Sequence, residues 1–145
     1  MKICITCSPG GHLIEAIQLL PILKGHEVFF YTYSEKHIKK KLCNKKTYII
    51  KKPLNILRNF WNSLKIFIKE KPDIVISTGA NVTVPISIIA KFFGKKLIFI
   101  ECSAQVFTPS LTGRILYPFA DLFIVQWKPL LKKYGKKAIY GGLLI

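Results

Sequence analysis

An α/β fold with a Rossmann-like, doubly wound parallel sheet is predicted for this chain of 145 residues. Apolar runs of strand length alternate with amphipathic helical patterns from one end of the sequence to the other, which is the order of βαβ units. Runs such as residues 73–77 and 97–101 are almost continuously apolar. That pattern is typical of parallel strands that helices cover on both faces of the sheet.

The expected elements follow one another without a linker, an internal repeat or a low-complexity block, so residues 1–145 are expected to form a single domain. Strands are expected at residues 2–7, 27–32, 47–51, 73–77, 97–101, 122–126 and 137–140. Helices are expected, from amphipathic spacing, at residues 11–24, 35–42, 54–70, 82–93, 112–119 and 128–134.

A glycine-rich turn joins the first expected strand to the first expected helix, where residues 8–15 read Ser-Pro-Gly-Gly-His-Leu-Ile-Glu. Gly10 and Gly11 allow a ligand to approach the backbone, and the helix N-terminus favours negative charge. His12 adds a side chain that exchanges a proton near neutral pH. The turn is neither GxGxxG nor a P-loop. A diphosphate or sugar site is one interpretation, and a tight turn without a ligand is the other.

The four cysteines do not suggest a disulfide framework or a zinc site. Cys4 and Cys7 lie in the first expected strand, where residues three apart point to opposite faces. No second CxxC follows, and His12, His26 and His37 are scattered along the sequence. Buried thiols in a reducing compartment are therefore expected.

The expected helix at residues 54–70 collects most of its large apolar side chains on one half of a helical wheel, and Ile66 is the only large exception. A core-facing half is the default interpretation. The alternative is a bilayer interface, since Phe60, Trp61 and flanking lysines suit one. The Lys-rich stretch 36–46 would add to a surface that attracts anionic lipid.

Small and polar residues follow the expected strands, at the sheet edge where ligands of open parallel sheets bind. They occupy positions 8–12, 33–34, 77–80, 101–103 and 126–127. Asn81 is expected to cap the next helix. Glu101 ends an apolar strand in a chain with few acids. Both a site role and an ion pair with one of the many lysines remain open for it.

Charge narrows the possible partners. The chain has 23 Lys and Arg against 7 Asp and Glu, for a net charge of +16. Such a field attracts nucleic acid, an anionic membrane or a phosphate-bearing ligand, although a lysine-rich compositional bias is an alternative. No nucleic-acid-binding module is recognisable. No segment has the ~20 apolar residues of a membrane span, and no secretory leader is evident. A cytosolic domain with peripheral membrane contact is expected.

Several linked segments carry a family resemblance. They are residues 8–15, 72–94, 98–127 and 133–142, which include SPGGHLIE and IFIECSAQVFTPSLTGR. With these segments the chain resembles the membrane-associated, acceptor-side subunit of the two-component UDP-N-acetylglucosamine transferase of dolichol-linked oligosaccharide synthesis, and its prokaryotic relatives in polysaccharide biosynthesis. The eukaryotic subunit begins with a transmembrane helix, which this sequence is not expected to form.

The resemblance implies the N-terminal half of a GT-B glycosyltransferase. A donor-binding subunit would complete a heterodimer at the cytoplasmic face of the membrane. The pair would move N-acetylglucosamine or another hexose from a UDP-sugar to a polyprenyl- or dolichyl-diphosphate-linked sugar. No cofactor or metal would be required, because basic side chains and helix N-termini can neutralise the leaving diphosphate.

The resemblance also implies roles for individual residues. His12 is the expected general base, and Glu101 is the alternative. Acceptor binding is expected from Gly10, Gly11, Glu15, Thr78, Gly79, Ser103, Thr112 and Arg114. Two other functions stay open: a non-catalytic scaffold that recruits a transferase to the membrane, and, less favoured, a nucleic-acid-binding protein.

Overall fold

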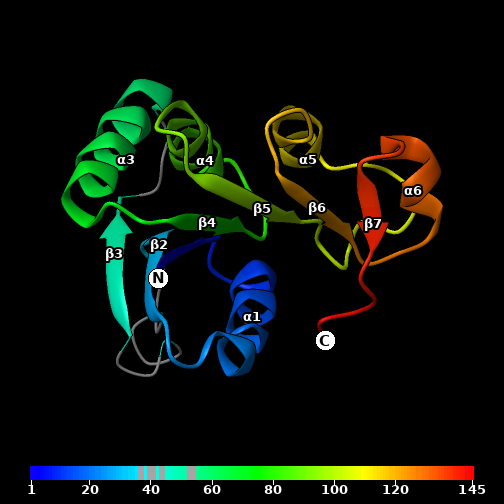
Figure 1. The fold of residues 1–145 in the computed structure, drawn as a ribbon, viewed down its shortest axis with the longest axis horizontal. Coiled ribbons are helices and arrows are strands. Elements are labelled where there is room, and N and C mark those ends of the chain that lie inside the picture. The colour runs from blue at the N-terminus through cyan, green and yellow to red at the C-terminus, as the bar shows by residue number, and fades with distance from the viewer. Residues whose placement is uncertain (36–37, 39–41, 43–44, 52–54) are drawn as a thin grey trace.

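A seven-stranded parallel sheet forms the centre of the computed structural model, which describes residues 1–35, 38, 42, 45–51 and 55–145 (Figure 1). The strand order is β3-β2-β1-β4-β5-β6-β7, and every neighbouring pair is parallel. The strands are β1 Lys2–Thr6, β2 Glu27–Tyr33, β3 Lys46–Ile50, β4 Ile74–Ser77, β5 Lys96–Ile100, β6 Leu122–Val125 and β7 Ala138–Tyr140. The predicted Rossmann-like fold is confirmed.

The helices begin and end close to the predicted positions, except that the first predicted helix is divided into two segments. They are α1 Gly11–Gln18, α3 Ile56–Glu70, α4 Thr83–Phe92, α5 Leu111–Leu116 and α6 Pro129–Tyr134. The first predicted helix stops at Gln18 and continues as the 3-10 helix η1, Leu20–Leu23, because Pro21 cannot donate a backbone hydrogen bond. The predicted helix 35–42 and the Lys-rich stretch 36–46 lie mostly outside the described residues.

Two apolar layers cover the sheet (Figure 1). One layer packs α3, α4, α5 and α6 on the sheet through buried residues such as Phe67, Ile86 and Leu130. The other packs α1 on the opposite face through Leu13 and Ala16. Cys4 belongs to the first layer and Cys7 to the second, and both are buried. This confirms that the two thiols point to opposite faces.

The strand order reverses at β1, which pairs with both β2 and β4. Helices leave the adjacent strands β1 and β4 toward opposite faces, α1 to one side and α4 to the other (Figure 1). Such a switch point opens a crevice beyond the carboxyl ends of the two strands, where ligands of this fold class bind. The turns after β1 and β4 are therefore the place to look for a site.

Helix α3 confirms the default prediction of an apolar, core-facing half only in its second half, where Leu64 and Phe67 pack in the core. Along its first half, polar side chains face the sheet, and the prediction is wrong there. Asn59 and Ser63 are buried, and each hydrogen-bonds the Tyr31 hydroxyl at 2.9 Å. A buried phenol needs such partners. The apolar side chains that point outward are Ile56, Leu57, Phe60, Trp61 and Ile68. Ile66, placed by the wheel on the polar half, packs against the core instead.

The helix cap predicted at Asn81 is also wrong. Helix α4 begins at Thr83, and no side chain caps its first turn. Thr83 Oγ1 instead donates to the Ala80 carbonyl at 2.8 Å and accepts from Ser77 Oγ at 2.9 Å. The turn that joins β4 to α4 is thus closed from within, by a hydroxyl of the helix itself.

Candidate functional site

His12 lies in the first turn of α1, directly above the turn that follows β4. Gly10, with φ +94°, makes the sharp entry into the helix. Thr78 Oγ1 donates to the His12 carbonyl at 2.9 Å, which ties the two turns together. A Cβ on Gly79 would lie 3.1 Å from His12 Cε1, and Gly79 has φ +110°. Only glycine therefore allows the imidazole to pack on the backbone at this point.

Glu15 lies one helical turn after His12 on the same face of α1. Only 1% of its surface is exposed. Oε1 accepts from the Ser103 backbone N–H at 2.8 Å. Oε2 is buried and has no hydrogen-bond partner among the described residues, and His12 Nδ1 is in the same condition. Two polar atoms that ordinarily find partners are thus left facing the same small space.

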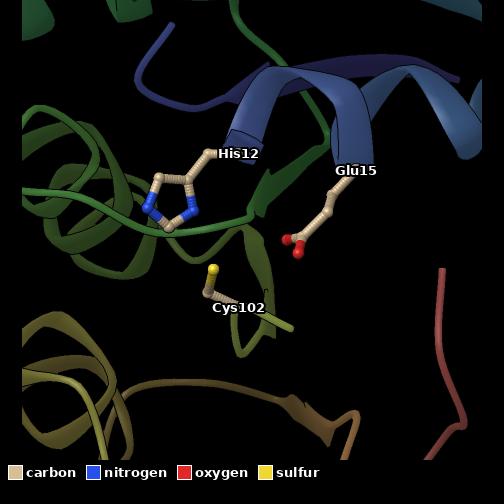
Figure 2. A group of neighbouring side chains, drawn as sticks. All are labelled: His12, Glu15 and Cys102. Atoms are coloured by element: carbon tan, nitrogen blue, oxygen red, sulfur yellow. The ribbon is translucent and has the colours of Figure 1, made fainter. Parts of the chain in front are cut away.

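Cys102 completes a cluster with these two residues, which we call the His12–Glu15–Cys102 cluster. A ring nitrogen, a carboxylate oxygen and the thiol sulfur lie within 4.8 Å of one another. Figure 2 shows Nδ1, the nitrogen beside the ring carbon that bears the side chain, on the side of Glu15 and Cys102, whereas Nε2 lies on the opposite side. Burial, together with the Glu15 and Glu101 carboxylates, raises the pKa of the Cys102 thiol.

Glu101 is equally buried, but its carboxylate is fully engaged. Oε1 accepts from the Cys102 backbone N–H at 3.0 Å. Oε2 accepts from the Ser110 N–H at 3.1 Å, from Ser110 Oγ at 2.9 Å and from the Tyr134 hydroxyl. Burial and this carboxylate both raise the pKa of Tyr134. No lysine among the described residues pairs with Glu101; its partners there are hydrogen-bond donors of Cys102, Ser110 and Tyr134.

The loop after β5 is held in place from several elements. Trp127 Nε1 donates to the Ser103 carbonyl at 2.7 Å, and Gln126 Nε2 donates to the Glu101 carbonyl at 2.9 Å. Gly113 of α5 lies against the Glu101 carboxylate, where any Cβ would collide with Tyr134 Oη and come within 2.6 Å of Glu101 Oε2. These contacts fix Cys102 and Ser103 beside α1.

The structure brings together only part of the predicted site. His12, Glu15, Thr78, Gly79 and Ser103 surround one point at the ends of β1, β4 and β5. Gly10 and Gly11 form the entry to α1 beside them. Thr112 is buried in α5 and Arg114 is exposed there. No hydrogen bond among the described residues joins either of these two to the His12–Glu15–Cys102 cluster.

Sequence reasoning placed Cys102 at this edge but did not name it as a site residue, and it missed Tyr134 altogether. The signal for Cys102 was its position directly after a strand, next to Glu101. Tyr134 had no comparable signal, because it lies 33 residues from its partner Glu101.

An apolar groove lies on the outer surface where α3, α4 and α5 meet. Its volume is about 290 Å³, and it is lined by Ile56, Asn59, Asn81, Val84, Pro85, Leu111 and Ile115. Beside it, Leu57 and Trp61 of α3 are 70% and 58% exposed. Of the helices formed by the described residues, none combines the length and hydrophobicity that crossing a bilayer requires.

Curated relatives cover more than half of this chain. The UDP-N-acetylglucosamine transferase subunit alg14 of Schizosaccharomyces pombe is 41% identical over 90 residues, which is 59% of this chain and 40% of that protein. The human subunit ALG14 is 37% identical over 94 residues, 61% of this chain and 44% of that protein. The chain thus spans less than half the length of these relatives.

Solved structures show the same fold at low sequence identity. MurG of Acinetobacter baumannii superposes with a TM-score of 0.79 at 18% identity, over 97% of this chain and 45% of that one. MnaA of S. aureus, solved with UDP, superposes with a TM-score of 0.76 at 16% identity, over 99% of this chain and 45% of that one. The fold is that of the N-terminal half of GT-B glycosyltransferases.

A family model extends over most of the sequence. The family described as "Oligosaccharide biosynthesis protein Alg14 like" matches residues 43–144. The matched region includes β4, β5 and the Glu101 loop that border the His12–Glu15–Cys102 cluster. With a match over more than half of its length, the chain belongs to the Alg14-like family of oligosaccharide biosynthesis proteins.

Proposed function

We propose that residues 1–145 are the acceptor-binding domain of a two-chain glycosyltransferase. A donor-binding subunit would supply the UDP-sugar, either UDP-N-acetylglucosamine or another UDP-hexose. The acceptor would be a sugar linked to a polyprenyl or dolichyl diphosphate. Membership of the Alg14-like family supports this proposal, as does the description of curated relatives as subunits of UDP-N-acetylglucosamine transferases.

The observation that carries the proposal is the position of the His12 ring beside the buried Glu15 carboxylate at the switch point, with His12 Nδ1 and Glu15 Oε2 both lacking a hydrogen-bond partner among the described residues. With its proton on Nδ1, directed at Glu15 Oε2, the imidazole keeps the lone pair of Nε2 free to act as a base. The acceptor hydroxyl attacks the anomeric carbon, the bond from that carbon to the UDP oxygen breaks, and Nε2 takes the hydroxyl proton. UDP leaves with the bonding electron pair.

In this mechanism Glu15 is a positioning residue rather than a contact for the acceptor, since it is 1% exposed. Thr78 and Gly79 fix the His12 backbone and ring. Gly10 and Gly11 offer backbone N–H groups to the diphosphate or to the first sugar of the acceptor. Ser103 borders the same space, and the exposed Arg114 is available to phosphate or to the partner subunit.

Glu101 is the weaker candidate for the base. Four donors occupy its carboxylate, on both oxygens, so neither oxygen is free to approach the hydroxyl of an acceptor. We propose that it instead holds the 102–110 loop in the shape that the site needs.

The outer surface of α3 and α5 is proposed to dock on the cytoplasmic face of an anionic membrane. This α3–α5 surface consists of Ile56, Leu57, Phe60, Trp61, Leu111 and Ile115, all exposed. Arg58, Lys65 and Arg114 are exposed on the same two helices. Apolar side chains within a basic border are the composition of an interfacial helix, and the net charge of +16 adds a long-range attraction.

Substitution of His12 tests the catalytic part of the proposal. The chain is co-expressed with its donor-binding subunit, and transfer from a UDP-sugar to a polyprenyl-diphosphate-linked sugar is measured. We expect His12→Ala to lower turnover by ~10²-fold or more, whereas the exposed His26 provides a matched control, His26→Ala, with unchanged turnover. Near-normal turnover of His12→Ala would exclude His12 as the base and would favour the scaffold function.

Vesicle binding tests the membrane part. We expect the double variant Leu57→Ser/Trp61→Ser to bind vesicles containing anionic lipid at least about tenfold more weakly in a sedimentation assay, because each lost apolar contact costs about 1 kcal/mol or more. Phe92→Ser removes a side chain that is even more exposed, 84% at the end of α4, and is the control. Equal losses in the two variants would show that the α3–α5 surface has no special role.

A further inference from the structure

Three different metal-ligating groups meet in the His12–Glu15–Cys102 cluster: an imidazole, a carboxylate and a thiol. They come from two segments that are far apart in sequence, α1 and the loop after β5 (Figure 2). His12 and Glu15 project from the same face of α1, one turn apart, and the Cys102 thiol points into the space between them.

Two of the three groups present a buried polar atom that lacks a hydrogen-bond partner among the described residues. Glu15 is 1% exposed, and its Oε2 has no hydrogen-bond partner within the described part of the chain; the same holds for the buried Nδ1 of His12. An unpaired buried acceptor is costly. A proton shared between Nδ1 and Oε2 would satisfy both atoms, and a cation would satisfy them equally well and engage the thiol too.

The spacing of the three atoms suits a small ion. In a tetrahedral zinc site, metal–ligand distances of about 2.0–2.3 Å set neighbouring ligand atoms about 3.3–3.8 Å apart. Here the three atoms lie within 4.8 Å of one another, so rotations of the Cys102 and Glu15 side chains would close the shell without moving the backbone.

The surroundings already orient the ligands as an outer coordination shell does. The Ser103 N–H holds Glu15 Oε1 at 2.8 Å and leaves Oε2 for the ion. The backbone of Gly79 packs against the His12 ring and fixes its rotation. The Cys102 N–H is bound to Glu101 Oε1 at 3.0 Å, which fixes the backbone that carries the thiol.

We propose that His12 Nδ1, Glu15 Oε2 and Cys102 Sγ bind one divalent transition-metal ion of the zinc class. Thiolate and imidazole together select zinc over magnesium or calcium, which prefer oxygen ligands. Three protein ligands leave a fourth position for water.

Occupancy of this site opposes the proposed transfer reaction, a consequence that rests on the function proposed above. A metal on Nδ1 takes that lone pair, so the proton of the neutral imidazole is held on Nε2. Nε2 then cannot accept the proton of the acceptor hydroxyl. Zinc is accordingly an inhibitor of the assembled enzyme rather than a cofactor.

Cobalt titration of the purified, reduced chain tests the metal site directly. We expect Co²⁺ to give the near-ultraviolet charge-transfer band of a thiolate ligand together with visible bands of a tetrahedral site, and Zn²⁺ to displace it stoichiometrically. Cys102→Ser should abolish the charge-transfer band. Glu15→Gln, which keeps an oxygen for the Ser103 N–H, should lower Zn²⁺ affinity at least about tenfold. His26→Ala is the matched control and should bind normally.

Thermal unfolding of each variant shows whether it is folded. If Cys102→Ser does not fold, the more conservative Glu15→Gln variant still tests the metal site. The absence of a thiolate band in the wild-type chain, or its persistence in Cys102→Ser, overturns the metal site and leaves the proposed function intact.

Turnover of the assembled enzyme is then followed with and without Zn²⁺, each variant relative to its own metal-free rate. Metal binding at the cluster with no loss of turnover would overturn the assignment of His12 as the base and leave the metal site standing.

Discussion

The acidic residues at the amino-terminal ends of the strands (the amino edge of the sheet) are paired differently from those at the carboxyl-terminal ends (the carboxyl edge). At the amino edge, acids pair with lysines: Glu27 and Glu70 with Lys2, Glu70 also with Lys46, Asp73 with Lys95, and Asp121 with Lys91 and Lys96. At the carboxyl edge, Glu15 and Glu101 are buried, and neither pairs with a lysine in the described part of the chain. Of the basic residues that the structure describes, none forms an ion pair with Glu15 or Glu101.

Within the carboxyl edge, the two carboxylates differ again. Glu101 has donors on both oxygens, whereas Glu15 has a donor on one oxygen only. A fully satisfied buried network makes a structure rigid, and an incomplete one retains capacity for a proton or a ligand. The comparison supports the proposed roles, in which Glu101 holds the loop after β5 and Glu15 positions His12.

The largest loss of stability is expected where side chains pack most tightly around the hydrogen-bonded Glu101 carboxylate. Gly113→Ala places a Cβ against Tyr134 Oη and within 2.6 Å of Glu101 Oε2. We expect a loss of about 3 kcal/mol or more in the free energy of unfolding, from overpacking together with broken hydrogen bonds, measured by urea denaturation. In the control Gly11→Ala, the new methyl group meets nothing within 4 Å, and stability should be nearly unchanged. Similar stabilities for both variants would contradict the tight packing around Glu101.

A matched pair of amides sharpens the contrast between the two carboxylates. Glu101→Gln brings an amide N–H₂ against groups that already donate, so we expect a loss of about 2–3 kcal/mol in unfolding free energy. Glu15→Gln keeps the acceptor for Ser103 and should cost less than about 1 kcal/mol. Urea denaturation of both variants measures the difference. A greater loss for Glu15→Gln would reverse our assignment of the two roles.

At the amino edge, the expected effect is smaller and depends on pH. Burial alone would raise the pKa of Glu70, but hydrogen bonds from Lys46, Tyr48 and Lys2 outweigh it and lower the pKa to about 2 from 4.5. A carboxyl whose pKa is lowered by folding stabilises the fold above its unfolded pKa. The full difference in pKa corresponds to about 3 kcal/mol. Because the Lys46 side chain is half exposed and its charge is screened by solvent, we expect about 2 kcal/mol from Glu70 at pH 6, lost as the pH falls from 4.5 toward 2.

Urea denaturation at pH 6 and pH 3 measures the contribution of Glu70. The Glu70→Gln variant should be less stable than the wild type at pH 6 and should lose less stability at pH 3. Parallel losses in the two proteins would assign the acid sensitivity to other carboxylates.

Local patterns were enough to predict the sheet. Each predicted strand ends within one residue of the observed strand, because the apolar runs are short and sharply bounded. From the sequence alone, the rule that ligands bind beyond the carboxyl ends of parallel strands also predicts that His12, Thr78, Gly79 and Ser103 lie at one edge.

Side-chain partners that are distant in sequence were not predictable in the same way. Tyr31 draws Asn59 and Ser63 of α3 inward across 28 and 32 residues, and this overrides the apolar half of the helical wheel. The pairing of Tyr134 with Glu101 spans 33 residues. Neither pairing leaves a periodic signal, since each depends on which elements the folded chain places next to each other.

In α3, the residues that anchor the helix to the sheet are different from the residues that form its outer surface. Asn59 and Ser63 anchor the helix to Tyr31, while Leu57 and Trp61 on the opposite side contribute little to that anchorage. Exchanges among the outward residues can therefore alter the proposed contact with a membrane without loosening the protein interior. Homologous chains would be free to diversify that exterior while the anchoring amide and hydroxyl stay the same.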